Sequence, residues 1–145
     1  MYELVYSSVA RNNLELSDVH EILEKSKKIN AVTEITGCLL YHKGQFTQIL
    51  EGSEEKIQEL YSRIEQDQRH FDLKLLYAGH KNERIFDNWT MAFMELDNIQ
   101  LGDISDPFFE NNLLLFSELT DKPTHAVKLF WEKVRQIIME SNSEQ

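Results

Sequence analysis

The sequence predicts an α+β protein with a ferredoxin-like βαββαββ arrangement, in which two helices cover one face of a mainly antiparallel sheet. Short segments of alternating apolar and polar residues are typical of strands. Two longer segments between them carry apolar residues at helical spacing. The pair Lys43-Gly44 favours a tight turn between two neighbouring strands. Two further helices are expected near the C-terminus.

The first βα unit is expected at the N-terminus. A strand is predicted at Tyr2–Val9, where alternation places Tyr6 on the same face as its apolar neighbours. A helix is expected to begin at Ser17, whose hydroxyl can cap free backbone amides, and to end near Asn30. Its apolar stripe includes two polar residues, Ser26 and Asn30.

A hairpin is expected next, with one strand on each side of Lys43-Gly44. In its second strand, Gln48 lies between Phe46 and Leu50 on the inner face. A buried amide without partners costs roughly 1–3 kcal/mol. Gln48 therefore needs a hydrogen-bond partner, which can be the backbone, a water molecule or a ligand.

A second helix and two more strands complete the predicted sheet. Ser53 is expected to cap the helix, with acidic residues in its first turn, and the helix is expected to end near Asp67. Strands are predicted at residues 73–81 and 89–96.

The chain is expected to divide into a domain of residues 1–97 and a C-terminal extension of residues 98–145. Asp106-Pro107 predicts the start of a short helix, and a second helix is expected from Pro123. The apolar stripe of this second helix includes Trp131. It either packs on the free face of the sheet or forms an output or self-association surface.

Composition excludes several classes of function. The chain has 145 residues and a net charge of −10, which argues against nucleic-acid and anionic-membrane partners. Neither a signal peptide nor a membrane-spanning segment is expected. Cys38 is the only cysteine and is expected to be inert in the core, with the cytoplasm as the expected compartment. Metal-ligand spacings, phosphate-binding glycine motifs and catalytic constellations are absent, so neither a metal nor an enzyme is predicted.

Four polar side chains interrupt the apolar pattern and are placed to converge on the cleft between the two helices. They are Tyr6, Ser26, Asn30 and Gln48. Side-chain amides offer one acceptor oxygen and two donor hydrogens, so they can complement the edge of a planar heteroaromatic ligand. Ile22 and Ile64 would enclose its ring, and Arg63 and Asp67 would reach polar substituents.

The same residues also allow a purely structural interpretation. Tyr6 can be a core aromatic, Ser26 can bond to its own helix, and Asn30 can end that helix. Arg63 and Asp67 can form a surface pair one helical turn apart. From the residues alone, the prediction is a ligand-binding module without a ligand identity.

Five segments stand in order between about Met1 and Asp97, namely LVYSS, LEKSKKIN, ITGCLLYHKGQFTQILEG, IEQDQRH and FDNWTMAF. Together they resemble the BLUF family of blue-light receptors. The resemblance implies the BLUF fold with FAD held non-covalently between the two helices. The short C-terminal extension is similar to that of stand-alone members without a fused output domain.

The resemblance also implies roles for individual residues. Tyr6 corresponds to the photoactive tyrosine, and Gln48 to the switching glutamine between that tyrosine and flavin N5/O4. Asn30 is expected at the flavin carbonyl edge, with Ser26 nearby. The remaining positions are Arg63 and Asp67 on the second helix, and Trp89 and Met91 on the fifth strand, of which one lies near the glutamine.

The mechanism that the resemblance implies is a photoswitch. Light excites the flavin, Tyr6 donates an electron, and its proton moves through the Gln48 amide. The amide is left rotated or tautomerised and forms a new hydrogen bond to flavin O4, which shifts the spectrum to the red. The signal is expected to pass through the fifth strand to a protein partner or a second copy of the chain. The alternative is a non-photoactive module for ligand binding or oligomerisation.

Two residues depart from the family pattern. Ile29 stands where many members have a polar or histidine side chain, so one flavin contact is expected to be missing. Glu34 stands where a glycine often precedes Ile-Thr-Gly, so an altered turn is expected after Asn30.

Overall fold

The computed structural model describes residues 1–86, 91–95 and 124–143. Its elements are β1 (Tyr2–Ala10), α1 (Leu16–Thr33), β2 (Thr36–His42), β3 (Gln45–Gly52), α2 (Glu54–Gln66), β4 (His70–His80), β5 (Ala92–Glu95) and α4 (His125–Ser143). This order confirms the predicted βαββαββ arrangement. Trp89 and the helix expected after Asp106-Pro107 lie outside the described residues.

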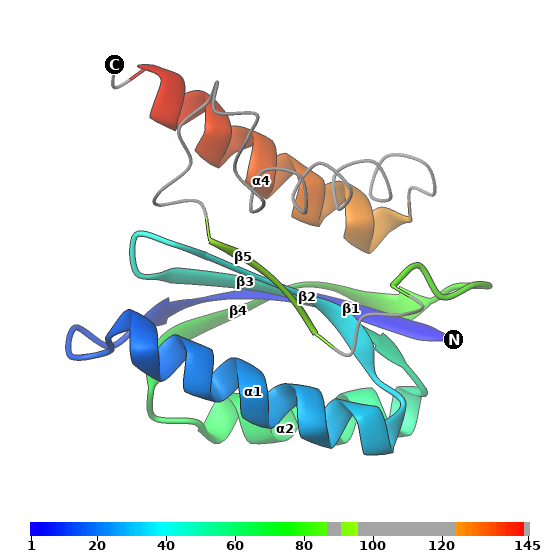
Figure 1. Cartoon of the computed structure of the whole chain (residues 1–145). Helices are drawn as coiled ribbons and strands as arrows, with labels where there is room; N and C mark the ends of the chain where they lie inside the picture. The colour runs from blue at the N-terminus through cyan, green and yellow to red at the C-terminus, as the bar shows by residue number, and fades with distance from the viewer. Residues whose placement is uncertain (87–90, 96–123, 144–145) are drawn as a thin grey trace, which may run out of the picture.

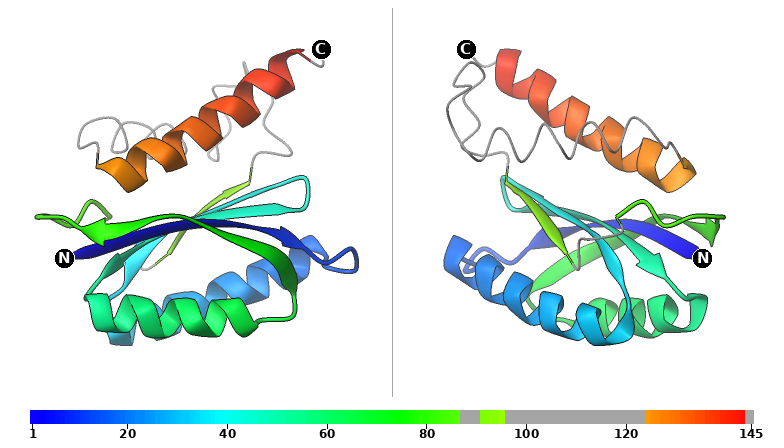
Figure 2. Two further views of the ribbon diagram at one scale, coloured as in Figure 1. Left: turned by 180° about the vertical axis from the view of Figure 1, so that it is seen from behind. Right: turned by 45° about the vertical axis from the view of Figure 1, so that its right-hand side comes forward.

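The strands form one sheet in the order β4-β1-β3-β2-β5. β3 is antiparallel to both β1 and β2, β1 is antiparallel to β4, and β5 is parallel to β2. Figures 1 and 2 show α1 and α2 side by side on one face of this sheet and α4 on the other. The sheet is therefore covered on both faces, and the predicted two-helix face is confirmed.

Side chains of β3 alternate between the two faces and so reach two different cores. Phe46 and Leu50 belong to the core under α1 and α2. Ile49 belongs to the core under α4, together with Cys38. Cys38 is fully buried, as predicted, and burial raises the pKa of its thiol above the usual range.

The turn between β2 and β3 has the backbone geometry of a tight hairpin. Lys43 has a φ of 46° and Gly44 a φ of 74°. Positive φ at both central residues is typical of a type I′ turn, whose twist matches that of the flanking strands. The predicted two-residue connection is therefore confirmed.

Among the described residues, no helix combines the length and the hydropathy that crossing a membrane requires.

The apolar stripe of α4 packs on the sheet. Val127, Phe130 and Val134 are fully buried in one cluster with residues of the sheet. Trp131 is only partly buried against this cluster. Phe130 therefore contributes more to this core than Trp131, which the sequence had singled out.

Phe130→Ala is expected to lower the free energy of unfolding by about 3–5 kcal/mol, because it removes a large buried side chain and leaves a cavity. Urea unfolding followed by circular dichroism measures the loss. Lys128→Ala, at an exposed position of the same helix, is the control and should change stability by less than about 0.5 kcal/mol. A loss below about 1 kcal/mol for Phe130→Ala would show that α4 does not pack as described.

The start of α1 differs from the prediction. The helix is capped at Glu15 and not at Ser17, and the Asp18 carboxylate accepts a hydrogen bond from the Glu15 N–H at 2.9 Å. Asp18 satisfies this amide and also complements the helix dipole in the first turn. Ser17 is exposed within that turn. The N-cap lies at Glu15 and not at Ser17 because Asp18, three positions after Glu15, binds the Glu15 amide.

The end of α1 lies at Thr33, three residues beyond the predicted Asn30. Glu34 follows in the left-handed conformation, with φ 57° and ψ 37°. This is the position at which helices favour glycine, because other residues incur steric strain there. The expected altered turn is therefore a strained cap.

Glu34→Gly is expected to raise the free energy of unfolding by about 1 kcal/mol, since glycine adopts this conformation without the Cβ penalty. Glu34→Ala keeps the penalty and serves as the control. Thermal unfolding of the two variants measures the difference. Equal melting temperatures for the glycine and alanine variants would mean that residue 34 carries no strain.

Candidate functional site

A cavity of about 200 Å³, partly open to solvent, lies between α1, α2 and the inner face of the sheet. All eight residues expected to bind a ligand line it, namely Tyr6, Ile22, Ser26, Asn30, Gln48, Arg63, Ile64 and Asp67. The remaining lining residues are Ile29, Leu39, Phe46, Leu60, Arg69 and His70.

A chain of hydrogen bonds begins at two residues that line the cavity, Tyr6 and Gln48, and continues to Met91. The Tyr6 hydroxyl donates to Gln48 Oε1 at 2.5 Å, and Gln48 Nε2 donates to Met91 Sδ at 3.3 Å. Tyr6 and Gln48 face each other because they are cross-strand partners on β1 and β3. All three side chains are buried. Met91 thus contacts the glutamine, and Trp89 lies outside the described residues.

The phenol of Tyr6 is held in its neutral form. Burial raises the pKa of Tyr6 well above its usual range, and the nearby Tyr61 and Asp67 raise it further. The ring of Tyr61 lies 5.7 Å from that of Tyr6, centroid to centroid. Tyr6 is therefore a hydrogen-bond donor to Gln48 throughout the physiological pH range.

Stability of the protein without ligand is expected to fall as pH rises above about 10, where an unfolded tyrosine ionises. Between this pH and the higher pKa of folded Tyr6, the folded protein holds one proton more than the unfolded chain. The free energy of unfolding then falls by up to about 1.4 kcal/mol per pH unit. Urea unfolding from about pH 9 to 11 should show a shallower dependence for Tyr6→Phe. Equal slopes would contradict the raised pKa.

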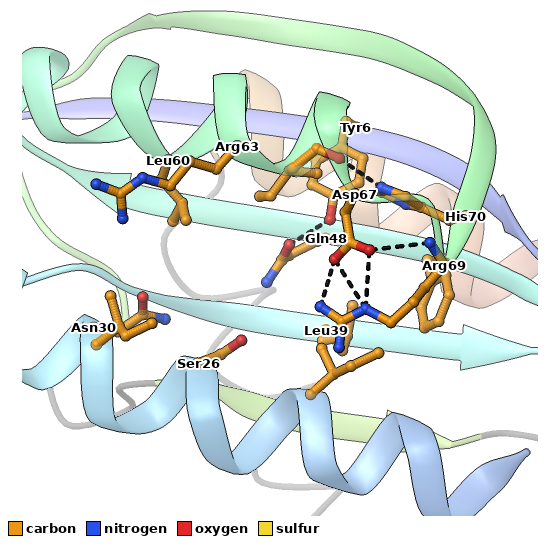
Figure 3. A pocket seen from close by; sticks show the side chains of 14 residues that line it. Tyr6, Ser26, Asn30, Leu39, Gln48, Leu60, Arg63, Asp67, Arg69 and His70 are labelled. Atoms are coloured by element: carbon orange, nitrogen blue, oxygen red, sulfur yellow. Dashed lines mark hydrogen bonds and ion pairs between the residues drawn. The ribbon is translucent and has the colours of Figure 1, made fainter. Parts of the chain in front are cut away.

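Residues of α1 and α2 form the two side walls of the cavity. Ser26 and Asn30 extend from α1 toward the strand that carries Gln48 (Figure 3). Ile22 on α1 and Ile64 on α2 supply apolar surface from the two helices. Ile29 also lines the cavity and adds an apolar side chain to the wall that α1 forms.

The polar residues at the end of α2 pair differently from the prediction. Asp67 accepts hydrogen bonds from Arg69 Nε at 2.9 Å and Nη2 at 2.5 Å, which lowers the pKa of this carboxyl. Arg63 pairs with Glu59 at 3.1 Å, and both side chains are exposed. The surface pair of Arg63 and Asp67 that the sequence allowed is therefore wrong: a carboxylate two residues before an arginine can be bound by it in a bidentate manner.

His70 is a wall residue that the sequence analysis missed. Its Nε2 lies 2.6 Å from the carbonyl oxygen of Ile64, and its Nδ1 lies 2.8 Å from the hydroxyl of buried Ser8. A carbonyl only accepts, so Nε2 donates, and in the neutral imidazole Nδ1 accepts from Ser8. These bonds fix the ring beside Tyr6, with 6.5 Å between the two ring centroids.

The donor set of the cavity fits the isoalloxazine ring of FAD. The amide groups of Asn30 and Gln48 can complement an imide-like edge, which offers alternating acceptors and a donor. The apolar side chains of Ile22, Leu60 and Ile64 suit the flat faces and the hydrocarbon end of the ring. The cavity is partly open to solvent, and the exposed Arg63 is one of its lining residues.

Two curated proteins of different length are similar to this chain in sequence. Photoactivated adenylate cyclase subunit beta of Euglena gracilis is 36% identical over 90 residues, which are 61% of this chain and 10% of that protein. The blue light- and temperature-regulated antirepressor BluF of Escherichia coli (strain K12) is 27% identical over 113 residues, 78% of this chain and 28% of that protein. The chain thus spans less than a third of either relative.

The fold and the sequence lead to the same family. The solved ground-state structure of BlsA matches with a TM-score of 0.65 and 28% identity, covering 79% of this chain and 87% of that one. Residues 1–92 match the family model for BLUF, sensors of blue light using FAD. Since this match covers more than half of the 145 residues, the chain belongs to the BLUF family of blue-light sensors that use FAD.

Proposed function

We propose that this protein senses blue light through a photoswitch whose moving part is the Gln48 amide. The observation that carries the proposal is the hydrogen-bond chain from Tyr6 through Gln48, which line the cavity, to buried Met91. A side-chain amide has donor and acceptor groups of nearly the same size, so it can exchange them in place. The protein acts as a sensor and not as an enzyme.

The cavity residues divide between binding and switching. Bound FAD supplies the absorption of blue light and one-electron chemistry. Tyr6 is the electron and proton donor, and its hydroxyl proton lies on the 2.5 Å bond to Gln48 Oε1, along which it can move with little heavy-atom displacement. Ser26 and Asn30 hold the polar edge of the ring, with Ile22 and Ile64 on its faces. Arg63 and Asp67 lie at the end where polar substituents leave.

Reversal of the Gln48 amide has a direct consequence for Met91. In the present orientation Nε2 donates to Met91 Sδ. A rotated amide would turn its carbonyl oxygen toward the thioether, which has no hydrogen of its own to donate. Met91 would then lose its bond and shift, and this shift would change the start of β5. Trp89 is the second residue through which we expect this change to travel.

We further propose that the signal leaves through protein–protein contacts in the cytoplasm, with a homo-oligomer as the first candidate assembly. The partly exposed Trp131 on α4 is a candidate contact, since α4 covers the face of the sheet opposite Gln48. Size-exclusion chromatography in darkness and under blue light, on wild type and Met91→Ala, tests this output. Identical elution in all four runs, with the spectral shift preserved in wild type, would exclude self-association as the output.

The switch itself is tested by absorption spectroscopy on protein loaded with FAD in the dark. Denaturation should release the FAD, because it is bound non-covalently. Blue light is expected to shift the flavin band slightly to the red, and darkness should restore it. Bleaching without a shift, or an unchanged spectrum with FAD bound, would contradict the proposal.

A further inference from the structure

A buried carboxylate lies on the opposite face of the strand that carries Gln48. Glu51 is three residues after Gln48 on β3, has no exposed surface, and faces away from the cavity. Its Oε1 accepts from the Thr36 hydroxyl at 2.8 Å and from the Phe86 N–H. Its Oε2 accepts from Lys81 Nζ at 2.5 Å and from the Ile85 N–H at 2.9 Å. Both oxygens are thus fully engaged, which compensates for burial of the charge.

Three of these four donors belong to the chain that follows β4. Lys81, Ile85 and Phe86 all bind the Glu51 carboxylate, and Arg84 adds bonds to the Thr36 hydroxyl at 2.7 Å and to the Glu51 carbonyl at 3.3 Å. Ile85 and Phe86 are also buried in the core under α4. Glu51 therefore fixes this segment to β3 by backbone and side-chain bonds together.

The anchored segment leads directly to the residue that contacts the switch. Met91 follows Phe86 by five positions, a length of chain that spans at most about 17 Å. The Met91 Sδ accepts a hydrogen bond from Gln48. Strand β3 therefore contacts residues 85–91 at two points, through Glu51 on one face and through Gln48 on the other. Only four residues separate Phe86 from Met91. We therefore expect a displacement of residues 85–86 to change the position of Met91.

We propose that Glu51 is a positioning residue that holds Met91 in contact with Gln48 and so governs the return of the switch to its dark arrangement. The proposal rests on the proposed role of the Gln48 amide. Glu51 touches neither the cavity nor the amide, and it acts only through the segment that it anchors.

A second buried carboxylate offers a matched control. Glu3 lies directly opposite Glu51 in the β1–β3 pairing and is equally buried. It accepts a hydrogen bond from the Thr124 hydroxyl, which also caps the start of α4 by accepting from the Val127 N–H. Glu3 therefore anchors α4, and Glu51 anchors the chain before Met91.

The first test follows the Met91 methyl group by NMR in the full chain with ¹³C-methyl methionine, both with FAD in the dark and without FAD. The chain has four methionines, and Met91→Leu assigns the signal. Glu51→Gln keeps the shape of the side chain but replaces one acceptor oxygen by a donor, which cannot accept from the N–H groups. Glu51→Gln is expected to shift or broaden the Met91 signal, whereas Glu3→Gln should leave it in place.

The second test measures the dark recovery of the spectral shift. Recovery should be slower in Glu51→Gln by up to about tenfold, the effect of one ordinary hydrogen bond that must re-form between Gln48 and Met91. Glu3→Gln should recover at the wild-type rate. In a Met91→Ala background, Glu51→Gln should have no further effect, because the residue through which it acts has lost its sulfur.

Several results would overturn the proposal. One is an unchanged Met91 signal in folded Glu51→Gln, and another is an equal effect of Glu3→Gln on that signal. A tenfold change in recovery that persists in the Met91→Ala background would also contradict it. Should Glu51→Gln fail to fold, Thr36→Val removes a single donor to the carboxylate, and the same criteria apply to it. The methyl signal needs no light response, so it tests the anchor even if the switch proposal fails.

Discussion

Gln48→Leu is expected to abolish the light-induced red shift while the protein keeps its fold and most of its FAD. Leucine fills a similar volume on the inner face of β3 but neither donates nor accepts a hydrogen bond. Tyr6 then loses its acceptor and Met91 its donor, at 2.5 Å and 3.3 Å in the present structure. Absorption spectra in darkness and under blue light measure the result.

Gln45→Leu is the matched control, since it makes the same substitution at an exposed position of the same strand. It should retain a normal shift. The loss of the Tyr6 acceptor leaves a buried hydroxyl unpaired, which costs about 1–3 kcal/mol, so Gln48→Leu should also unfold at lower urea. A normal red shift in Gln48→Leu would refute the role assigned to the amide.

Tyr6→Phe is expected to bind FAD and to lose the normal photocycle. The phenyl ring still fills its place in the core, but the electron and proton donor is gone, and Gln48 Oε1 loses the hydrogen bond that orients it. Transient absorption after a blue flash should show no red-shifted product.

Tyr61→Phe tests whether any nearby phenol can replace Tyr6. Its ring centroid lies 5.7 Å from that of Tyr6, and the side chain is only partly buried. This variant should keep the red shift, because the bond between Tyr6 and Gln48 is unchanged. A red-shifted product of normal yield in Tyr6→Phe would show that Tyr6 is not the donor. Loss of that product in Tyr61→Phe would point to Tyr61 instead.

Local patterns were sufficient to predict most of the fold and the centre of the site. Alternation placed Gln48 on the inner face of its strand, and Tyr6 followed the same alternation on the first strand. The pair Lys43-Gly44 adopts the positive φ values that a two-residue type I′ hairpin turn requires. These features depend on residues close together in sequence, so periodicity and turn chemistry determine them.

Features that depend on strand register or on long-range partners could not be predicted. His70 reaches the cavity because it pairs with Ala10 at the end of β1, and Ser8 then orients its ring. Glu51 finds its donors at Ile85 and Phe86, more than thirty residues away. The spacing of four residues allowed a pair of Arg63 with Asp67, whereas the structure pairs Arg63 with Glu59, four residues earlier on the same helix.

The most direct test of the central claim is the light-minus-dark infrared spectrum of protein in which glutamine carries ¹³C and ¹⁵N in the side-chain amide. Among the described residues, Gln48 is the only buried glutamine, and it alone contacts Tyr6. The amide bands of the difference spectrum should shift with the label and vanish in Gln48→Leu. A difference spectrum without label-sensitive bands, from a protein that still shows the visible red shift, would mean that the Gln48 amide is not the switch.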